Sequence, residues 1–290
     1  MWVATTVKQL RQRRSALLGK VVLVPTLGAL TDGHISLIKK GQSVAPNVIV
    51  SIFVNPTQFG PDEDYDQYPR PIEADLAVCR KCGITGVFHP SVNQMYPPQV
   101  PHCQVTIPAL ASILEGEHRP QHFAGVCRVV LKLFNMVQPA LACFGKKDFQ
   151  QLRILQILAA DLNLPTTIVA CETVRDEQGL ALSSRNVQLN AEQYRRALGL
   201  FEALGQAKAL VERAGQTDPQ RVETSMRQAM AGHQIDVDYA VVRHPLTLAE
   251  LPRIEPQFTG SVVALVAGHV DGVRLIDNMV LGREEGCVSV

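Results

Sequence analysis

The sequence predicts an α/β protein in which helices cover a parallel sheet, followed by a smaller α+β unit. Short apolar runs rich in Val and Ile recur through the first part of the chain, and segments with helical periodicity separate them. This alternation is typical of buried parallel strands connected by helices. After Arg185 the pattern changes to two helical stretches and then to alternating strand-like runs, which indicates an antiparallel sheet.

The expected elements follow from these patterns. Strands are predicted at residues 21–24, 48–54, 86–89, 140–144 and 167–170, and helices at residues 35–42, 72–83, 123–137 and 149–163. Beyond Arg185, helices are predicted at 191–214 and 219–231, and strands at 237–243, 261–270 and 273–277. The chain has 290 residues, which at about 150 residues per domain suggests two domains. We expect residues 1–173 to form the first domain and residues 174–290 a smaller one that closes over its site.

Composition and charge exclude several classes of protein. Lys and Arg number 28 against 27 Asp and Glu, and the net charge of +1 argues against a nucleic-acid or polyanion binder. No apolar run approaches the roughly 18 residues that a membrane span requires, so no membrane partner is expected. Seven cysteines, an odd number without a secretory leader, predict free thiols and a cytoplasmic location. Cys79 and Cys82 form a CxxC pair inside a predicted helix, which we interpret as chance spacing rather than half of a zinc site.

Ligands of open parallel sheets bind at the carboxyl ends of the strands, so polar residues at those positions are candidate site residues. The segment PTLGALTDGH at residues 25–34 joins the first strand to a helix. Its GxxxxG spacing resembles a phosphate-binding P-loop, but His34 and Ile35 follow where that loop has Lys and Ser or Thr. A helix N-terminus with free backbone N–H groups and His34 beside it would suit phosphate oxygens. Alternatively, the glycines only form turns and Thr31 or Asp32 caps the helix.

Three further polar clusters follow predicted strands. Asn55 and Gln58, after the second strand, offer amide groups for a small hydroxylated or carboxylated ligand, although an Asn-Pro turn is the simpler explanation. The acidic loop at residues 62–66 is interpreted as a solvated mobile lid rather than a metal site. Lys147 and Gln151 lie four residues apart, on one face once the helix starts. The fourth cluster, at residues 182–186, combines hydroxyl groups with Arg185, a pattern that suits a phosphate group.

Together these residues resemble a known family. The segments PTLGALTDGH, SIFVNPTQF, YPR, RPQHFAGV, KLFN, ACFGKKDFQQL and GLALSSRN are similar to those of the pantoate–β-alanine ligase (pantothenate synthetase) family as far as about Asn190, and RLIDN at residues 274–278 extends the resemblance weakly. The resemblance implies a Rossmann-like nucleotidyltransferase domain with a small C-terminal domain, usually dimeric. It also implies ATP and Mg²⁺ as cofactors, and a reaction in which pantoate and β-alanine form pantothenate through a pantoyl adenylate, with release of pyrophosphate and AMP.

The resemblance also implies roles for individual residues. His34 would be the catalytic histidine, and Lys147 and Arg185 would supply positive charge during attack on the α-phosphorus. Gln58 and Gln151 would hold pantoate, with Asn55 beside them and Gln58 also near β-alanine. The residues matching the ATP contacts of the family are Leu27, Gly28, Ala29, Leu30, Thr31, Asp32, Gly33, His34, Gly145, Lys146, Lys147, Asp148, Val174, Leu182, Ser183, Ser184 and Arg185.

Two departures from the family pattern affect these expectations. Thr31 stands where the HxGH motif of the family has its first histidine, and one lost donor costs about 3 to 4 kcal/mol of transition-state stabilisation. Arg128 stands where the family usually has Thr, but it lies off the stripe of Val126, Val129 and Val130 that would line the pantoate pocket, so we do not expect it to compensate.

The sequence has two alternative interpretations besides an active ligase. The first is a degenerate homologue that binds nucleotide or pantoate with weak or no turnover because of Thr31. The second is an aminoacyl-tRNA synthetase, which would need a tRNA-binding extension and a KMSKS-like loop that the sequence lacks. Intact Gln58 and Gln151 favour the ligase, because drift after loss of function would not spare both the substrate and the ATP residues.

Overall fold

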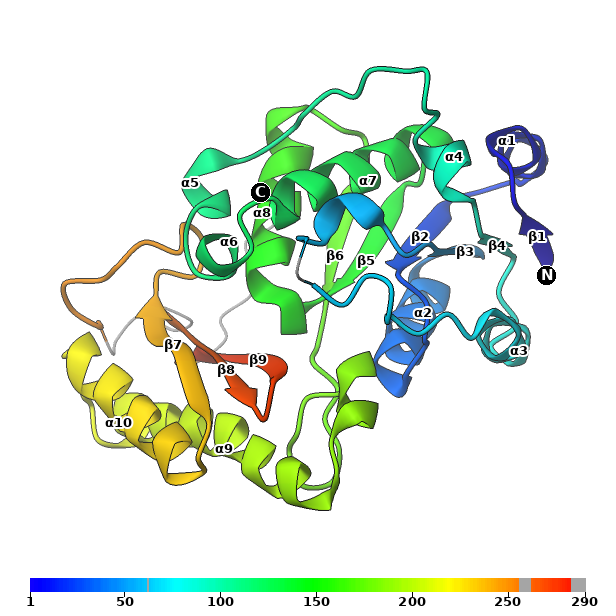
Figure 1. The fold of residues 1–290 in the computed structure, drawn as a ribbon. Coiled ribbons are helices and arrows are strands. Elements are labelled where there is room, and N and C mark those ends of the chain that lie inside the picture. Colours follow the sequence, from blue (N-terminus) through cyan, green and yellow to red (C-terminus); the bar gives the residue numbers. More distant parts are fainter. Residues whose placement is uncertain (62, 256–261, 283–290) are drawn as a thin grey trace. The chain divides into compact units, whose positions relative to one another are not determined.

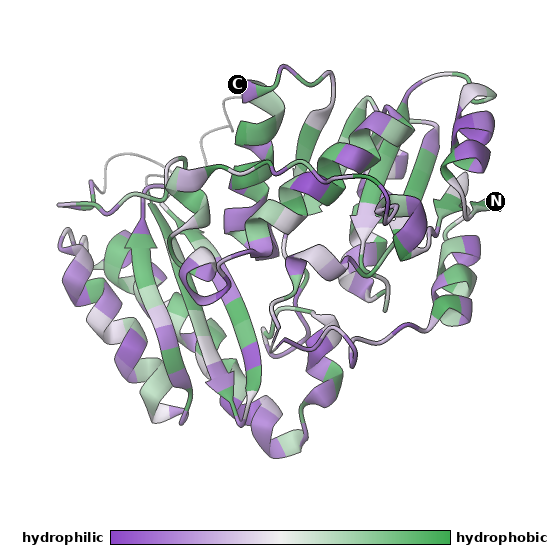
Figure 2. Ribbon diagram, turned by 45° about the horizontal axis from the view of Figure 1, so that its top comes forward, coloured by the Kyte–Doolittle hydropathy of each residue, from purple (hydrophilic) through white to green (hydrophobic). Residues whose placement is uncertain are grey.

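The computed structural model describes residues 1–61, 63–255 and 262–282, and it divides into two compact units (Figure 1). The first unit consists of Met1–Lys146 and Gln150–Glu172. The second consists of Lys147–Phe149 and Thr173–Val290, so a three-residue segment after the fifth strand of the first sheet groups with the C-terminal part of the chain. Both units have strands that are predominantly hydrophobic, as expected for sheets covered by helices (Figure 2).

The first unit contains a parallel sheet of six strands in the order β1-β4-β3-β2-β5-β6. This confirms the predicted α/β, Rossmann-like fold class. A short edge strand, β1, had no counterpart in the sequence prediction, because three residues are too few to show a period. The strands are β1 (Trp2–Ala4), β2 (Val21–Thr26), β3 (Asn47–Ile52), β4 (Gly86–Phe88), β5 (Leu141–Gly145) and β6 (Thr167–Cys171).

Helices connect these strands close to the predicted positions. The long helix α7 buries Val126, Val129 and Val130, the apolar stripe that the sequence showed. Gly41 of α2 lets that helix approach the sheet, since an added Cβ would lie 3.1 Å from Val22. The helices are α1 (Val7–Ser15), α2 (Asp32–Val44), α3 (Ile72–Lys81), α4 (Val92–Met95), α5 (Pro108–Ala111), α6 (Glu115–His118), α7 (His122–Val137) and α8 (Phe149–Asp161), with 3₁₀ turns η1 (Pro56–Gln58) and η2 (Lys146–Asp148).

The strand order reverses its direction at β2. Val22 pairs with Val48 of β3 on one side and with Leu141 of β5 on the other. The chain leaves β2 toward β3 and β4, and later returns to β5 and β6 on the opposite side. In doubly wound sheets the crevice at such a switch point is where nucleotides bind. The turn after β2 and the residues that end β5 therefore occupy the positions that the fold favours for a nucleotide.

The second unit has an antiparallel sheet in the order β7-β8-β9, as predicted. Two long helices pack on it through a core that includes Leu200, Leu204, Met226 and Val266. The predicted helix over residues 191–214 ends in a π turn, and the predicted strand start at Ser261 lies outside the described residues. The elements are η3 (Ser184–Gln188), α9 (Ala191–Lys208), η4 (Ala209–Arg213), α10 (Pro219–Gly232), β7 (Asp236–Arg243), β8 (Val262–Val270) and β9 (Val273–Leu281). Within the described parts of both units, no helix combines the length and hydropathy needed to cross a bilayer.

Candidate active site

The turn after β2 has a left-handed backbone at two consecutive residues, Gly28 (φ +94°) and Ala29 (φ 50°). A positive φ is unfavourable for alanine, so surrounding contacts must hold it in place. The Thr26 hydroxyl donates to the Ser51 carbonyl at 2.8 Å and accepts from the Gly28 N–H at 3.2 Å. The turn is therefore fixed at its start by the neighbouring strand.

Asp75 of α3 fixes the other half of this turn. Its Oδ2 accepts from the Ala29 N–H at 2.9 Å and its Oδ1 from the Leu30 N–H at 2.8 Å, and the side chain is buried. These two N–H groups are therefore occupied, but they precede the N-cap residue Thr31, so the expected free N–H groups at the N-terminus of the helix stay a prediction. Sequence reasoning missed Asp75, because an acid in the first turn of a helix is ordinary there; its burial on the face of Leu76 is visible only in the fold.

His34 lies in the first turn of α2, where Thr31 is the N-cap residue. The Thr31 N–H donates to His34 Nδ1 at 3.0 Å, and the Thr31 hydroxyl lies 3.1 Å from the same nitrogen. Because Nδ1 accepts the backbone N–H, the neutral ring carries its proton on Nε2. Thr31 therefore caps the helix and also orients the imidazole of His34, so the cap does not exclude a functional role for His34.

Asn55 and Gln58 meet at η1. Asn55 Nδ2 donates to Gln58 Oε1 at 3.0 Å and to the Gly125 carbonyl at 3.2 Å, and Asn55 Oδ1 accepts from the Tyr96 hydroxyl at 2.9 Å. Both amide side chains are buried. Since its Oε1 already accepts this hydrogen bond, the Gln58 carboxamide is held in one orientation, with its NH₂ group available as the donor.

Two residues of the segment RPQHFAGV hold η1 from the other side. His122 Nδ1 lies 2.9 Å from the Gln58 carbonyl oxygen and donates to it, while Arg119 forms a double hydrogen bond to Glu63 with a shortest distance of 2.5 Å. Arg119 Nη1 lies 3.3 Å from His122 Nε2, which therefore accepts. Burial, together with the positive charge of Arg119, lowers the pKa of His122 to about 4, so the ring is neutral at pH 7.

The acidic loop at residues 62–66 was predicted to be solvated, and the structure differs from this prediction at Glu63. Burial by itself raises the pKa of Glu63, but the hydrogen bonds and charge of Arg119 outweigh it and hold that pKa below its ordinary value. Glu63 is thus ion-paired and partly buried rather than solvated, a partner that only the fold reveals. Asp62, the first residue of this predicted lid, lies outside the described residues.

The remaining candidates of the first unit follow β5. Gly145 ends the strand, and Lys146 forms an ion pair with Glu172 at 2.5 Å. Gln151 lies in α8 beside the buried Gln150, whose amide accepts from the Glu115 N–H at 3.0 Å. Gln150 thereby ties α8 to α6, and its neighbour Gln151 is partly exposed on a fixed helix.

The second unit holds the other candidates. Lys147 and Asp148 form an ion pair at 3.7 Å in η2. Val174 and Leu182 face each other across a hairpin, where the Leu182 N–H donates to the Val174 carbonyl at 2.9 Å. The Ser183 hydroxyl accepts from the Arg185 N–H at 3.2 Å and starts η3.

Arg128 lies on α7 with its guanidinium 4.9 Å from the centre of the Tyr96 ring. Its Nε atom is buried without a hydrogen-bond partner, and none of the described carboxylates pairs with it. Val126, Val129 and Val130 are buried in the same helix, and a compensating role for Arg128 is not indicated by these contacts. The CxxC pair lies in and just after α3, where burial raises the pKa of the Cys79 thiol to about 12. In the part of the chain that the structure describes, no group of three His, Cys, Asp or Glu could hold a metal ion.

Comparison with known proteins gives a consistent result. A family model described as pantoate-beta-alanine ligase matches residues 2–280. A pantothenate synthetase from Chloroflexus aurantiacus is 48% identical over 289 residues, covering 98% of this chain and 99% of that protein. A solved pantothenate synthetase from Thermus thermophilus matches with a TM-score of 0.90 and 38% identity, covering 97% of this chain and 99% of its own. A pantoate-beta-alanine ligase from Francisella tularensis, solved with beta-gamma ATP and beta-alanine, matches with a TM-score of 0.78 and 33% identity, covering 97% of each chain.

Proposed function

The chain belongs to the pantoate-beta-alanine ligase family, as its motifs predicted, and we propose that it condenses pantoate with β-alanine at the expense of ATP. The observation that carries the proposal is the match along 98% of the chain to a pantothenate synthetase of nearly equal length. Part of the proposed ATP set, residues 27–34 and 145–146, follows β2 and β5 directly, at the edge of the sheet where nucleotides bind in this kind of fold, which supports the proposal.

The reaction has two steps. A pantoate carboxylate oxygen attacks the α-phosphorus of ATP, the bond to the β-phosphate breaks, and pyrophosphate leaves. The amine of β-alanine then attacks the acyl carbon of the pantoyl adenylate, loses a proton, and displaces AMP to give pantothenate. The first step needs the carboxylate held in line with the leaving pyrophosphate, and the second needs the amine held against the acyl carbon. Both need positive charge near the phosphate, and neither needs a covalent bond to the protein.

His34 is the proposed catalytic residue of the first unit. Its Nδ1 is occupied by the Thr31 N–H, so Nε2–H is the group that donates to a phosphate oxygen as negative charge develops. Thr31 contributes a hydroxyl near the same nitrogen and no second imidazole. We therefore expect the enzyme to work with one histidine donor from this motif.

The substrate side is assigned to Gln58, Gln151 and Asn55. Gln58 would donate its NH₂ group to pantoate, and it also lies near β-alanine in the family pattern. Asn55 fixes the Gln58 carboxamide through the 3.0 Å hydrogen bond. Gln151 would hold pantoate from α8.

ATP binding is supported by the Francisella tularensis relative, which was solved with beta-gamma ATP. We assign phosphate contacts to Lys147 and Arg185 as cations and to the hydroxyls of Ser183 and Ser184. The other proposed contacts are Leu27, Gly28, Ala29, Leu30, Thr31, Asp32, Gly33, Gly145, Lys146, Asp148, Val174 and Leu182. We further propose that the C-terminal domain, residues 174–290, closes over the nucleotide.

Mg²⁺ is also part of the proposal. This ion commonly binds through substrate phosphates and one or two carboxylates, so a three-residue protein cluster, which the described residues lack, is not required. The carboxylates of the ATP set are Asp32 and Asp148, and neither is assigned as a ligand of the ion. When bound with ATP, Mg²⁺ would neutralise phosphate charge. A homodimer and a cytoplasmic location complete the proposal, supported by the family pattern and by the cysteine content.

The experiment is an assay of AMP release with pantoate and β-alanine omitted in turn. We expect release only when both are present, and we expect His34→Ala to lower kcat about a hundredfold or more. A nucleotide- or pantoate-binding homologue without turnover, the alternative that the comparisons do not favour, would bind ATP and release no AMP. AMP release that continues when pantoate is omitted would contradict the proposed chemistry.

A further inference from the structure

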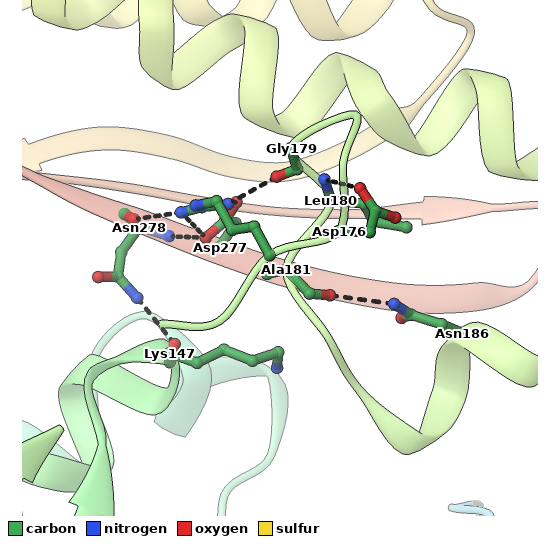
Figure 3. A network of polar contacts seen from close by, with 9 residues as sticks. Lys147, Asp176, Gly179, Leu180, Ala181, Asn186, Asp277 and Asn278 are labelled. Atoms are coloured by element: carbon green, nitrogen blue, oxygen red, sulfur yellow. Dashed lines mark hydrogen bonds and ion pairs between the residues drawn. The ribbon is translucent and has the colours of Figure 1, made fainter. Parts of the chain in front are cut away.

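Two adjacent residues of β9, Asp277 and Asn278, are buried where two segments assigned to ATP come together (Figure 3). They belong to the RLIDN segment, which the proposed function leaves without a role. One segment is η2 with Lys147, and the other is the hairpin that carries Val174 and Leu182. All of these residues lie in the second unit.

Asp277 fixes the hairpin through Arg175, the residue that follows Val174. Arg175 donates to both carboxylate oxygens of Asp277, at 2.5 Å and 2.9 Å, and also to the Gly179 carbonyl at 3.0 Å. Its guanidinium packs 4.7 Å from the centre of the Phe201 ring. The Asp277 side chain is only 1% exposed, so this two-point ion pair is formed away from water and fixes the direction of the hairpin.

The hairpin in turn fixes the loop at residues 182–186, which contains Arg185 and is proposed to bind phosphate. Arg175 bridges to Ala181 across the hairpin, and the Leu182 N–H donates to the Val174 carbonyl. Asn186 Nδ2 then donates to the Ala181 carbonyl at 3.0 Å, which closes the loop that contains Arg185. The amide oxygen of Asn186, Oδ1, is buried without a hydrogen-bond partner.

Asn278 holds the other segment. Its Nδ2 donates to the Lys147 carbonyl at 2.7 Å, and its own N–H donates to Asp277 Oδ1 at 2.8 Å (Figure 3). The Asp277 carboxylate therefore accepts hydrogen bonds from both the Arg175 guanidinium and the backbone N–H of Asn278. A short, direct hydrogen bond from a strand residue to the backbone of Lys147 fixes the point from which the lysine side chain extends.

We propose that Asp277 and Asn278 are positioning residues, which hold the Lys147 turn and the hairpin of Val174 and Leu182 in the mutual arrangement that binds ATP. The inference rests on the proposed function, because it takes the ATP assignments of these segments from there. Neither residue is assigned contact with substrate. Their loss therefore weakens ATP binding and leaves pantoate binding unchanged, whereas a purely structural role would affect stability and all substrates alike.

The test uses the full-length protein with Asn278→Ala and the isosteric Asn278→Asp, which cannot donate to the Lys147 carbonyl. We expect each variant to raise KM for ATP and the ATP dissociation constant measured by calorimetry by about 3- to 10-fold, as for one lost hydrogen bond. We expect KM for pantoate to stay within twofold, and Asn278→Gln, which keeps a donor, to recover part of the loss. Asp271→Asn, which weakens an exposed ion pair with Arg196 in the same unit, is the matched control.

The outcomes separate this inference from the proposed function. If the wild-type protein releases AMP but the Asn278 variants keep their affinity for ATP, or lose affinity for pantoate equally, the positioning role is wrong and the function stands. If the wild-type protein binds ATP without turnover, calorimetry still decides the positioning role. If it binds no ATP, both proposals are wrong.

Discussion

Lowering the pH should destabilise the first unit through one buried histidine, His122. The ring lies between two fixed partners, donating from Nδ1 to the Gln58 carbonyl at 2.9 Å and facing Arg119 Nη1 from Nε2 at 3.3 Å. A second proton on the ring would sit against the guanidinium and would be cut off from water. The protein therefore holds His122 neutral, and burial and Arg119 lower its pKa from 6.5 to about 4.

The size of the effect follows from these two values. The ordinary and the folded-state pKa of His122 differ by about 2.5, and each unit of pKa corresponds to about 1.4 kcal/mol. The unfolded chain takes up the proton first, so the stabilisation is complete above pH 6.5 and is lost as the pH falls toward 4. Proton linkage predicts that the free energy of unfolding falls by about 2 kcal/mol between pH 7.5 and pH 5, and by about 3 kcal/mol once the pH is below 4. Glu63, with its lowered pKa, contributes to acid unfolding only below about pH 4.5.

Urea unfolding at pH 7.5 and pH 5 measures this difference in the full-length protein. His122→Gln removes the titrating group and should reduce the pH-dependent loss of unfolding free energy by about 2 kcal/mol. His102→Gln, at an exposed position, is the matched control. If His122→Gln loses as much stability between the two pH values as the wild type does, the assignment of a neutral, acid-sensitive His122 is refuted.

Three other predictions concern the proposed active site. Thr31→His should raise kcat/KM by tenfold or more, since one well-placed donor is worth about 3 kcal/mol, and an unchanged or lower value would count against this account of Thr31. Asp75→Asn should raise KM for ATP and lower the free energy of urea unfolding by about 1 to 3 kcal/mol, because a buried acceptor of two N–H groups is lost, whereas the exposed Glu73→Gln should do neither. Gly125→Ala should raise KM for pantoate and lower stability by about 1 to 3 kcal/mol, because a Cβ there would collide with the backbone of η1; wild-type kinetics would contradict the close packing.

The regular elements could be predicted because their signals are local. Val and Ile runs and helical periodicity gave the sheet strands and the long helices, and the antiparallel second sheet followed from the change in pattern. The edge strand Trp2–Ala4 was missed because it is short and lies beside β4, far along the sequence.

The site residues that the sequence did not reveal act through contacts between distant segments. Asp75 reaches the turn after β2 across 46 residues, and Asn278 reaches Lys147 across 131. Asp75 has no sequence context that distinguishes it from an ordinary helix residue, and Asn278 lies in the RLIDN segment, to which the sequence alone gave no role. Glu63 gave the wrong expectation for the same reason, because its cluster of acids indicated exposure and its partner Arg119 lies 56 residues away.

Ligation through a pantoyl adenylate transfers an oxygen atom from pantoate to AMP, and isotope labelling detects this transfer. Pantoate labelled with ¹⁸O in both carboxylate oxygens is incubated with the protein, ATP and β-alanine, and the products are analysed by mass spectrometry. Attack of the carboxylate on the α-phosphorus predicts one ¹⁸O in each AMP and one in each pantothenate. AMP without ¹⁸O, formed together with pantothenate, would contradict a pantoyl adenylate intermediate.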